Sequence, residues 1–212
     1  MKFTNTETYN FISALRGMRN PLQSHAKSDS YMNDDIAVIG ENDLNLAQRL
    51  LVAGTEHSKF MRQIFVSVDI TAPIYWWSEM DTYKIGTTAN SCSTMHTLHK
   101  HSITKDMFET DDDLDINKYG SLGELDVVIS YLEGLRLKYI ETGDYNYFRE
   151  LKQLLPSSFL QTRTWTANYA VIRNIYNQRC YHKHKLREWS TDFKNWVHTL
   201  PYSKELITYG LV

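Results

Sequence analysis

The stretch from Leu154 to Trp189 constrains the fold more than any other part of this sequence. It reads LLPSSFLQTRTWTANYAVIRNIYNQRCYHKHKLREW. Proline suits the first turn of a helix and serine hydroxyls satisfy free backbone N–H groups there. Pro156 followed by Ser157 and Ser158 therefore predicts one long helix that begins near Pro156 and continues through this stretch.

Four residues of this stretch recur at steps of four, three and four, and so share one face of a helix. They are Asn168, Ile172, Ile175 and Arg179. A buried polar group without a partner costs about 1–3 kcal/mol, so the asparagine and the arginine each need one. Two interpretations remain open: an Asn–Arg pair inside the core, or a ligand that supplies the missing partners.

The same stretch resembles the C-terminal signature of the flavin-dependent thymidylate synthases, which is LP, then WT-x-N, then N-x(4)-R. Without gaps, the matching positions are Pro156, Trp165-Thr166, Asn168, Asn174 and Arg179. The resemblance implies a single domain over residues 1–212 with an α+β fold, in which helices pack on a small, mostly antiparallel sheet. It also implies a homotetramer whose sites are built from several subunits.

The resemblance further implies an activity, namely reductive methylation of dUMP to dTMP. Methylenetetrahydrofolate would be the carbon donor, FAD the hydride carrier and NADPH the reductant. On this basis Arg179 would hold a carbonyl of the pyrimidine and favour ionisation of its ring, because a fixed cation lowers the pKa of a neighbouring N–H acid. Lys152 would bind the same nucleotide, while Asn168 and Asn174 would hydrogen-bond the flavin.

The first residues predict an amphipathic helix that starts near Tyr9, is capped by Thr6 and Glu7, and ends at Asn20-Pro21. Arg16 and Arg19 lie on one face of it, which suits a phosphate or carboxylate, or a surface pair without a ligand. ALRGMRNPLQS resembles the family's R-x-x-R-x-S segment near the flavin. Residues 24–41 are polar and rich in turn formers, and are predicted to form a loop.

Asp43 is predicted to cap a second helix that ends at Gly54. Residues 64–70, IFVSVDI, alternate and are β-branched, which predicts a strand. The segment around them, AGTEHSKFMRQIFVSVDITAPIYWW, resembles the family's GHETPFEH–strand–API block. Its second histidine is replaced by Gln63, which can form hydrogen bonds but cannot carry a proton at neutral pH.

The segment that defines the family, R-H-R followed by E-x-S and R, is changed here. R-H-R falls on Thr82-Tyr83-Lys84 and the later arginine on Thr94, so the family's charge-assisted hydrogen bonds to the flavin are lost and a ligand must be held differently or not at all. The resemblance places Tyr83, Lys84 and Asn90 towards the flavin. It places a set of three residues beside the nucleotide: Glu79, Cys92 and Ser93.

Cys92 allows two interpretations. A thiolate at this position could add to C6 of a pyrimidine, because thiolates attack activated alkenes. The alternative is a plain buried thiol with no chemical role.

Residues 97–147 are the part that differs most from the family. Ser121 with Glu124 forms a capping-box pattern ahead of an amphipathic helix to Ile140, and Asp144 is predicted to open a short helix. Further strands are expected within 85–110. The acidic run 109–113 is predicted to be a solvated loop, and the His182–Lys185 cluster lacks ligand spacing for a metal.

Composition restricts the class of protein. The formal net charge of the 212 residues is −2, which gives no case for a nucleic-acid polymer or an anionic membrane. There is no apolar run of membrane-spanning length, MKFTNTETYN does not resemble a signal peptide, and two cysteines form no disulfide framework. We therefore expect a cytoplasmic protein.

Three functions are open on the sequence alone. The first is the enzyme described above. The second is a catalytically altered or inactive relative that binds or modifies another pyrimidine nucleotide, which the changed 82–94 segment favours. The third is a structural oligomer without a ligand, against which the stripe containing Arg179 argues.

Overall fold

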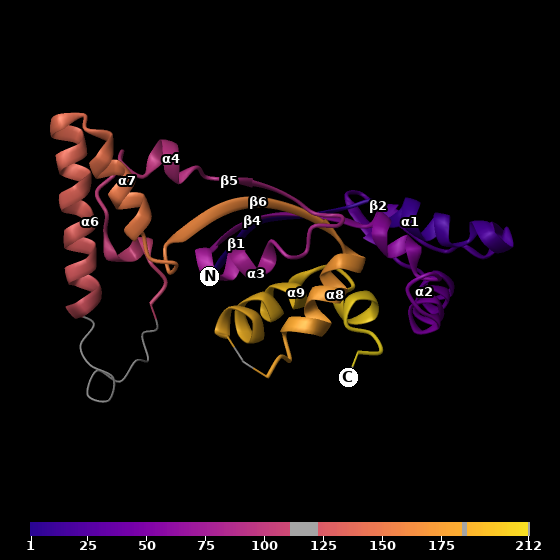
Figure 1. Ribbon diagram of the computed structural model, residues 1–212. Helices are drawn as coiled ribbons and strands as arrows, with labels where there is room; N and C mark the ends of the chain where they lie inside the picture. Colours follow the sequence, from indigo (N-terminus) through magenta and orange to yellow (C-terminus); the bar gives the residue numbers. More distant parts are fainter. Residues whose placement is uncertain (111–122, 184–185, 212) are drawn as a thin grey trace. The chain divides into compact units, whose positions relative to one another are not determined.

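A computed structural model of the chain describes residues 1–110, 123–183 and 186–211 (Figure 1). Within it the chain forms two compact units, each described by itself. The main unit contains Lys2–Ile70, Thr82–Ala89 and Thr164–Val212. The helix-pair unit contains Met1, Thr71–Asp81 and Asn90–Arg163. The prediction of a single domain over 1–212 stays a prediction.

Four strands hydrogen-bond in the order β1-β4-β6-β5. Their bounds are Lys2–Tyr9 for β1, Phe65–Pro73 for β4, Thr88–Ser91 for β5 and Leu160–Asn168 for β6. In β4 every second side chain is buried, as alternation of Val66, Val68 and Ile70 predicts. The predicted strand at 64–70, a further strand within 85–110 and the α+β class with an antiparallel sheet are confirmed.

The main unit packs short helices on its part of these strands. Its helices are α1 (Phe11–Met18), η1 (Asn20–Leu22), η2 (His25–Lys27), α2 (Glu41–Ala53), η3 (Lys59–Gln63), α8 (Tyr169–Arg179), η5 (Glu188–Phe193), α9 (Lys194–Thr199) and η6 (Ser203–Ile207). A core of α1, β4 and α8 side chains includes Leu15, Ile70 and Ile172, each at 0% exposure. Apolar residues three and four apart on each helix account for this burial.

The helix-pair unit is dominated by α6 (Gly123–Thr142) and α7 (Tyr145–Leu154), which lie side by side in Figure 1. Asp144 caps α7 by accepting a hydrogen bond from the backbone N–H of Asn146, as predicted. Shorter helices complete the unit: α3 (Ile74–Met80), α4 (Thr94–Thr97) and η4 (Lys105–Met107). Its core contains Ile129 and Leu132 of α6 with Phe148 and Leu151 of α7.

The long helix predicted from Pro156 to the end of this stretch is wrong on both sides of α8, because α8 ends at Arg179 and residues 180–183 are not helical. Residues Leu160–Asn168 form strand β6, and the helix begins only at Tyr169. β-Branched threonines occupy every second position here, with Trp165 and Ala167 buried between them. This two-residue period favours a strand, and it outweighs the proline and serines that suggested a helix start.

The N-terminal prediction is also corrected. Residues Lys2–Tyr9 form β1, and α1 begins two residues later than expected, at Phe11. Asn10 precedes it in the left-handed region, with φ 72°, and its side chain donates to the carbonyl of Gln63 instead of capping the helix. Thr4, Thr6 and Thr8 alternate as β-branched residues do in strands, a signal that the helix prediction overlooked.

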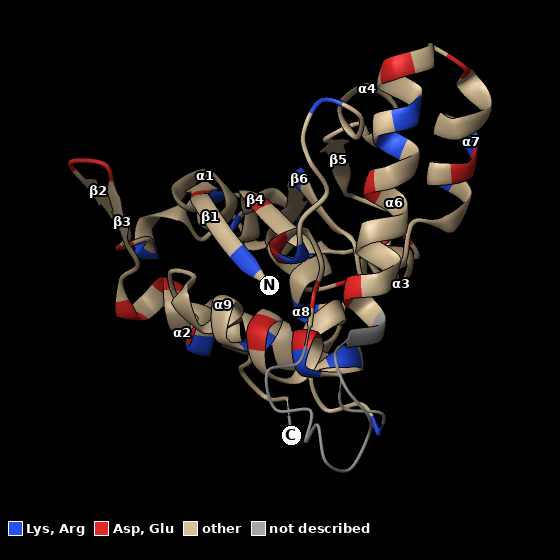
Figure 2. Cartoon of the chain, turned by 90° about the vertical axis from the view of Figure 1, so that its left-hand side faces the viewer, with Lys and Arg blue, Asp and Glu red and all other residues tan. Residues whose placement is uncertain are grey.

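Two further predictions in the same region differ from the structure. The expected loop at 24–41 contains an antiparallel hairpin of β2 (Tyr31–Asn33) and β3 (Ile36–Val38), whose acidic turn is red in Figure 2. The second helix is capped by Gly40, and Asp43 lies buried within its first turn. Its predicted end at Gly54 is confirmed, since that glycine adopts φ 115°.

Some predictions concern residues outside the described ranges: the capping serine Ser121, residues 111–113 of the acidic run, and His184 with Lys185. Among the described residues, no helix combines the length and apolar character needed to cross a bilayer.

Candidate functional site

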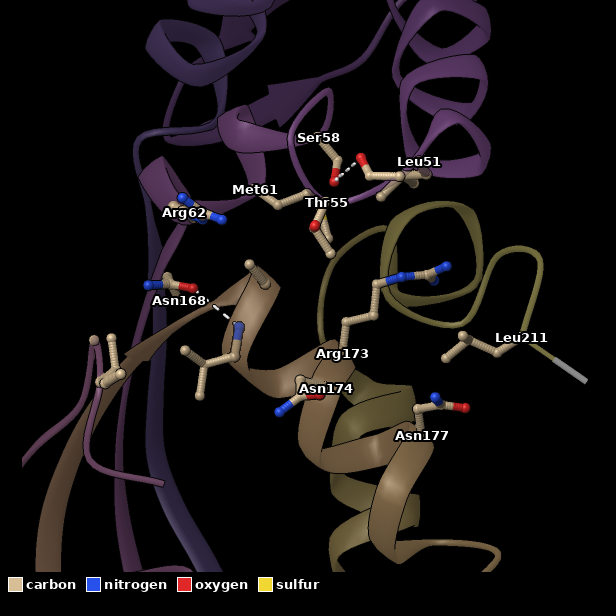
Figure 3. A pocket seen from close by; sticks show the side chains of 15 residues that line it. Leu51, Thr55, Ser58, Met61, Arg62, Asn168, Arg173, Asn174, Asn177 and Leu211 are labelled. Carbon is tan, nitrogen blue, oxygen red and sulfur yellow. Dashed lines mark hydrogen bonds between the residues drawn. The ribbon is translucent and has the colours of Figure 1, made fainter. Parts of the chain in front are cut away.

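The main unit contains a cavity of about 660 Å³ beside α8 (Figure 3). This volume lies within the range of small-molecule and cofactor pockets. One wall is the face of α8 that carries Arg173, Asn174 and Asn177, together with Asn168 at its N-terminus. The remaining walls come from the turn after α2, from η3, from the loop before β5, and from Leu211.

Two amides of this wall are held in fixed orientations. Asn168 is 7% exposed and caps α8, because its Oδ1 accepts the N–H of Val171 at 3.0 Å. The Oδ1 of Asn174 accepts from Nε2 of Gln178, also at 3.0 Å. With both oxygens used inside the protein, each amide offers N–H donors to a ligand, which suits carbonyl or ring-nitrogen acceptors.

A glycine lets the backbone approach this wall. Gly86 has φ +74°, and a Cβ at this position would lie 3.0 Å from Nδ2 of Asn168 and 3.4 Å from the side chain of Val171. Any other residue would therefore be strained and would press on the amide. Glycine at this position therefore leaves the Asn168 amide undisturbed in the cavity wall.

Two arginines line the cavity in different ways. Nη1 of Arg173 donates to the carbonyls of Ile207 and Tyr209, each at 2.7 Å, which holds the C-terminal segment against α8. Burial lowers the pKa of Arg173 below its usual value. Arg62 is exposed, and its ion pair with the exposed Glu56 is long, at 3.9 Å. Such a loose surface pair is easily exchanged for an anionic ligand.

Arg179 does not line this cavity. The stripe predicted with it is real, but Ile172 and Ile175 are fully buried, so it mainly faces the core. Nε of Arg179 donates to the hydroxyl of Tyr83 at 2.9 Å. Its guanidinium carbon lies 5.6 Å from the ring centre of Tyr83 and 5.7 Å from that of Trp189.

The two N-terminal arginines have different environments. Arg16 is exposed, whereas Arg19 is 3% exposed and its Nε donates to Oδ1 of Asp43 at 2.5 Å. The other carboxylate oxygen of Asp43 accepts from Ser28 Oγ and from the N–H groups of Asp29 and Ser30. Burial alone would raise the pKa of Asp43, but these hydrogen bonds lower it below its ordinary value.

Several predicted site residues lie in the helix-pair unit. Nζ of Lys152 donates to Oγ1 of Thr94, and burial lowers the pKa of this lysine. Cys92 is an exposed free thiol, and its backbone N–H donates to the carbonyl of Thr162. The same unit contains Glu79, Asn90 and Ser93; the main unit contains Arg16, Arg19, Gln63, Tyr83, Lys84, Asn168, Asn174 and Arg179.

Of these residues, the structure places Asn168 and Asn174 together in the cavity wall. Gln63 and Lys84 are exposed outside the lining. Sequence reasoning missed a further set of polar lining residues: Thr55, Ser58, Arg62, Arg173 and Asn177. For the last two a signal existed, because Ala170, Arg173, Asn174 and Asn177 recur at helical spacing on one face of α8.

No group of three or more potential metal ligands occurs in the part of the chain that the structure describes. No known protein-family profile matches the sequence, and no curated protein sequence matches it.

Solved structures do match, and they define the class of fold. The chain has the fold of the flavin-dependent thymidylate synthases. A crystal structure of thymidylate synthase X (ThyX) from Helicobacter pylori with FAD and dUMP superposes with a TM-score of 0.72 and 18% identity, over 98% of this chain and 97% of that one. A second structure of ThyX from Helicobacter pylori, complexed with FAD and dUMP, gives 0.69 and 18%, over 98% of each chain.

Proposed function

We propose that this protein is an enzyme of the flavin-dependent thymidylate synthase type, which binds FAD and reductively methylates dUMP to dTMP. Methylenetetrahydrofolate is the proposed carbon donor and NADPH the proposed reductant. The observation that carries the proposal is the donor-lined cavity of about 660 Å³, in a chain whose fold matches FAD- and dUMP-bound structures along nearly its whole length.

The volume and the polar lining of the cavity support a flavin site. Bound FAD supplies hydride transfer, which no amino-acid side chain provides. Asn168 and Asn174 offer N–H donors, and these suit the carbonyl and ring-nitrogen acceptors of an isoalloxazine. Gly86, on which a Cβ would press against Asn168, leaves that amide undisturbed. Arg62 is the exposed lining cation that would pair with the pyrophosphate.

The proposed nucleotide residues act through charge and hydrogen bonds. Arg179 would hold a pyrimidine carbonyl and stabilise the ring as it loses its N–H proton. In the proposed homotetramer, whose sites are built from several subunits, Lys152, which is partly desolvated beside Thr94, would supply a second positive charge to the nucleotide. A set of four residues would complete the contacts beside the nucleotide and flavin: Glu79, Asn90, Cys92 and Ser93.

Purified protein tests the cofactor directly. We expect a yellow protein with flavin absorbance, or an apoprotein that takes up FAD and melts at a higher temperature in its presence. A colourless protein that takes up no FAD would remove the flavin assignment.

Replacement of Arg179 by Ala tests the nucleotide site. We expect dUMP binding, measured by calorimetry on FAD-loaded protein, to be lost, while circular dichroism shows that the variant keeps its fold. Unchanged dUMP affinity would contradict the role of Arg179.

A second candidate function is a relative with altered chemistry that binds or modifies another pyrimidine nucleotide. The observation that favours it concerns Tyr83 in the changed 82–84 segment. This tyrosine accepts a hydrogen bond from Arg179, at a position where the family has a histidine. Thermal-shift comparison of dUMP with dCMP, dTMP and UMP separates the two candidates. Preference for a nucleotide other than dUMP, without dTMP formation, would favour this alternative.

The proposal includes a homotetrameric assembly. Exposed apolar side chains on α6 support it: Val127 at 70%, Leu137 at 52% and Ile140 at 55%. Light scattering after gel filtration gives the subunit number, and a monomeric mass would contradict this part of the proposal.

A further inference from the structure

We infer that Tyr83 is a positioning residue for Arg179, and that it links Arg179 to the proposed flavin cavity through Gln178. The inference rests on the proposed function and extends it to a residue that replaces the histidine of the family's R-H-R segment. Three hydrogen bonds within the main unit carry it, and they form one continuous chain.

The direction of each hydrogen bond follows from the chemistry of its groups. Arg179 can only donate, so its Nε–H donates to the hydroxyl oxygen of Tyr83 at 2.9 Å. That hydroxyl donates its own proton to Oε1 of Gln178 at 3.0 Å. Nε2 of Gln178 then donates to Oδ1 of Asn174 at 3.0 Å. Tyr83 and Gln178 therefore each accept one hydrogen bond of this series and donate the next, which fixes the orientation of both side chains.

The last residue of this series of hydrogen bonds, Asn174, lines the cavity. Because its Oδ1 is occupied by Gln178, Asn174 turns its Nδ2 donor towards the lining (Figure 3). A ligand acceptor at Asn174 would therefore favour the same orientation of Gln178 that receives the Tyr83 proton. Hydrogen bonds in such a chain polarise one another, so occupancy of the cavity strengthens the bond that holds Arg179.

Aromatic rings restrict Arg179 further. The guanidinium carbon lies within cation–π distance of the rings of Tyr83 and Trp189, at 5.6 Å and 5.7 Å. Tyr83 thus fixes Arg179 in two ways, through its hydroxyl and through its ring. Phenylalanine at this position would keep the ring contact and remove the hydroxyl acceptor, which isolates the contribution of the hydrogen bond.

The inference predicts a coupling between two ligands. By reciprocity, if FAD tightens dUMP binding by some factor, dUMP tightens FAD binding by the same factor. We expect a factor on the order of fivefold in the unmodified protein, comparable to the contribution of one hydrogen bond.

Tyr83→Phe is the principal test. FAD affinity is measured by flavin fluorescence with and without dUMP, and dUMP affinity by calorimetry on FAD-loaded protein. We expect dUMP to bind about fivefold more weakly. FAD alone should bind within about twofold of the unmodified protein, and the coupling factor should fall to about one, because one hydrogen bond carries it. Tyr181→Phe is the matched control. The Tyr181 hydroxyl contacts Tyr176, which takes no part in the series of hydrogen bonds from Arg179 to Asn174, so none of these values should change.

Two further variants separate positioning from a general effect on structure. Gln178 is exposed, and Gln178→Ala keeps the Arg179–Tyr83 bond but breaks the link to Asn174. It should therefore abolish the coupling: dUMP should bind the FAD-free variant as tightly as the FAD-free unmodified protein, and FAD should no longer tighten it. In an Arg179→Lys background, where no Nε–H of a guanidinium remains, Tyr83→Phe should have no further effect on dUMP affinity.

The outcomes distinguish this inference from the proposed function. If unmodified protein binds FAD and dUMP but Tyr83→Phe binds dUMP as tightly and keeps the coupling, the positioning role is wrong and the proposed function stands. If Tyr83→Phe weakens dUMP binding equally in the Arg179→Lys background, Tyr83 does not act through Arg179. If the unmodified protein binds neither ligand, the proposed function itself fails.

Discussion

Each unit of this protein buries one arginine beside a carboxylate, and the two pairs differ in how they are built. Arg136 in the helix-pair unit is 7% exposed and pairs with Glu133, one turn earlier on the same helix. Arg19 in the main unit is 3% exposed and pairs with Asp43, which is 24 residues away and fully buried. The first pair is local and the second joins α1 to α2.

The difference shows that the partner of one buried arginine can be read from the sequence while the partner of the other cannot. Glu133 and Arg136 stand at the spacing at which helical neighbours meet, so their pairing needs no tertiary information. No local pattern in the sequence around Arg19 predicts that it pairs with Asp43. The resemblance predicts Arg19 near a flavin, and this role stays a prediction; in the structure its Nε donates to a carboxylate that also accepts hydrogen bonds from residues 28–30.

The largest expected effect is that of Asp43→Asn. Removal of one partner leaves a buried charge uncompensated, which costs about 3–5 kcal/mol. Urea unfolding measures the change in unfolding free energy. Glu133→Gln is the matched variant: its partner Arg136 is as buried, but the Glu133 side chain is 23% exposed, so we expect a smaller loss of about 1–2 kcal/mol. Equal losses would mean that burial of the carboxylate does not distinguish the pairs.

The stability of the protein at acidic pH should depend on the same two carboxylates, Asp43 and Glu133. The hydrogen bond from Arg136 lowers the pKa of Glu133 from its ordinary 4.5, and the pKa of Asp43 lies below 3.8. A lowered folded-state pKa gives stability that is present above the unfolded value and lost as the pH falls through the folded value. We therefore expect the melting temperature to decline as the pH falls from about 4.5 through 3.8 and below. Asp43→Asn should flatten this decline more than Glu133→Gln does.

A smaller effect is expected at the helix caps of the two units. Asn168→Ala removes the cap of α8 and Asp144→Ala removes the cap of α7, each costing about 1 kcal/mol. Only Asn168 also lines the cavity, so only Asn168→Ala should weaken FAD binding in a fluorescence titration. Equal FAD affinity in both variants would contradict the assignment of the cavity.

The smallest effect on stability is expected for Arg62→Ala. Its long, exposed ion pair contributes under about 0.5 kcal/mol. As a charged partner of the pyrophosphate, Arg62 should contribute more to binding, so FAD affinity should fall about tenfold. Arg49→Ala, which removes an exposed arginine away from the cavity, is the control and should change neither value.

Elements with one strong local signal were predictable from the sequence. The alternation around Val66 and Val68 gave β4, and the aspartate before Tyr145 gave the start of α7. Where two local signals compete, the prediction failed. Pro156 and the serines after it suggest a helix, yet the threonines of Leu160–Asn168 form a strand, because pairing with β4 decides between them.

The site was predictable only along α8. Asn168 and Asn174 follow from one helix and one motif, and both reach the cavity. Thr55 lies in the turn after α2, Arg62 in η3 and Gly86 in the loop before β5, and no spacing within the sequence brings them to that helix. Their convergence is a property of tertiary packing alone.

The five tryptophans of the chain provide a separate optical readout for each unit. Trp76 and Trp77 lie in the helix-pair unit, whereas Trp165, Trp189 and Trp196 lie in the main unit. Phenylalanine substitutions confined to one unit would leave emission from the other, so that stepwise melting could be distinguished from a single concerted transition. Trp189, beside Arg179, would in addition report nucleotide arrival through a change in its quantum yield.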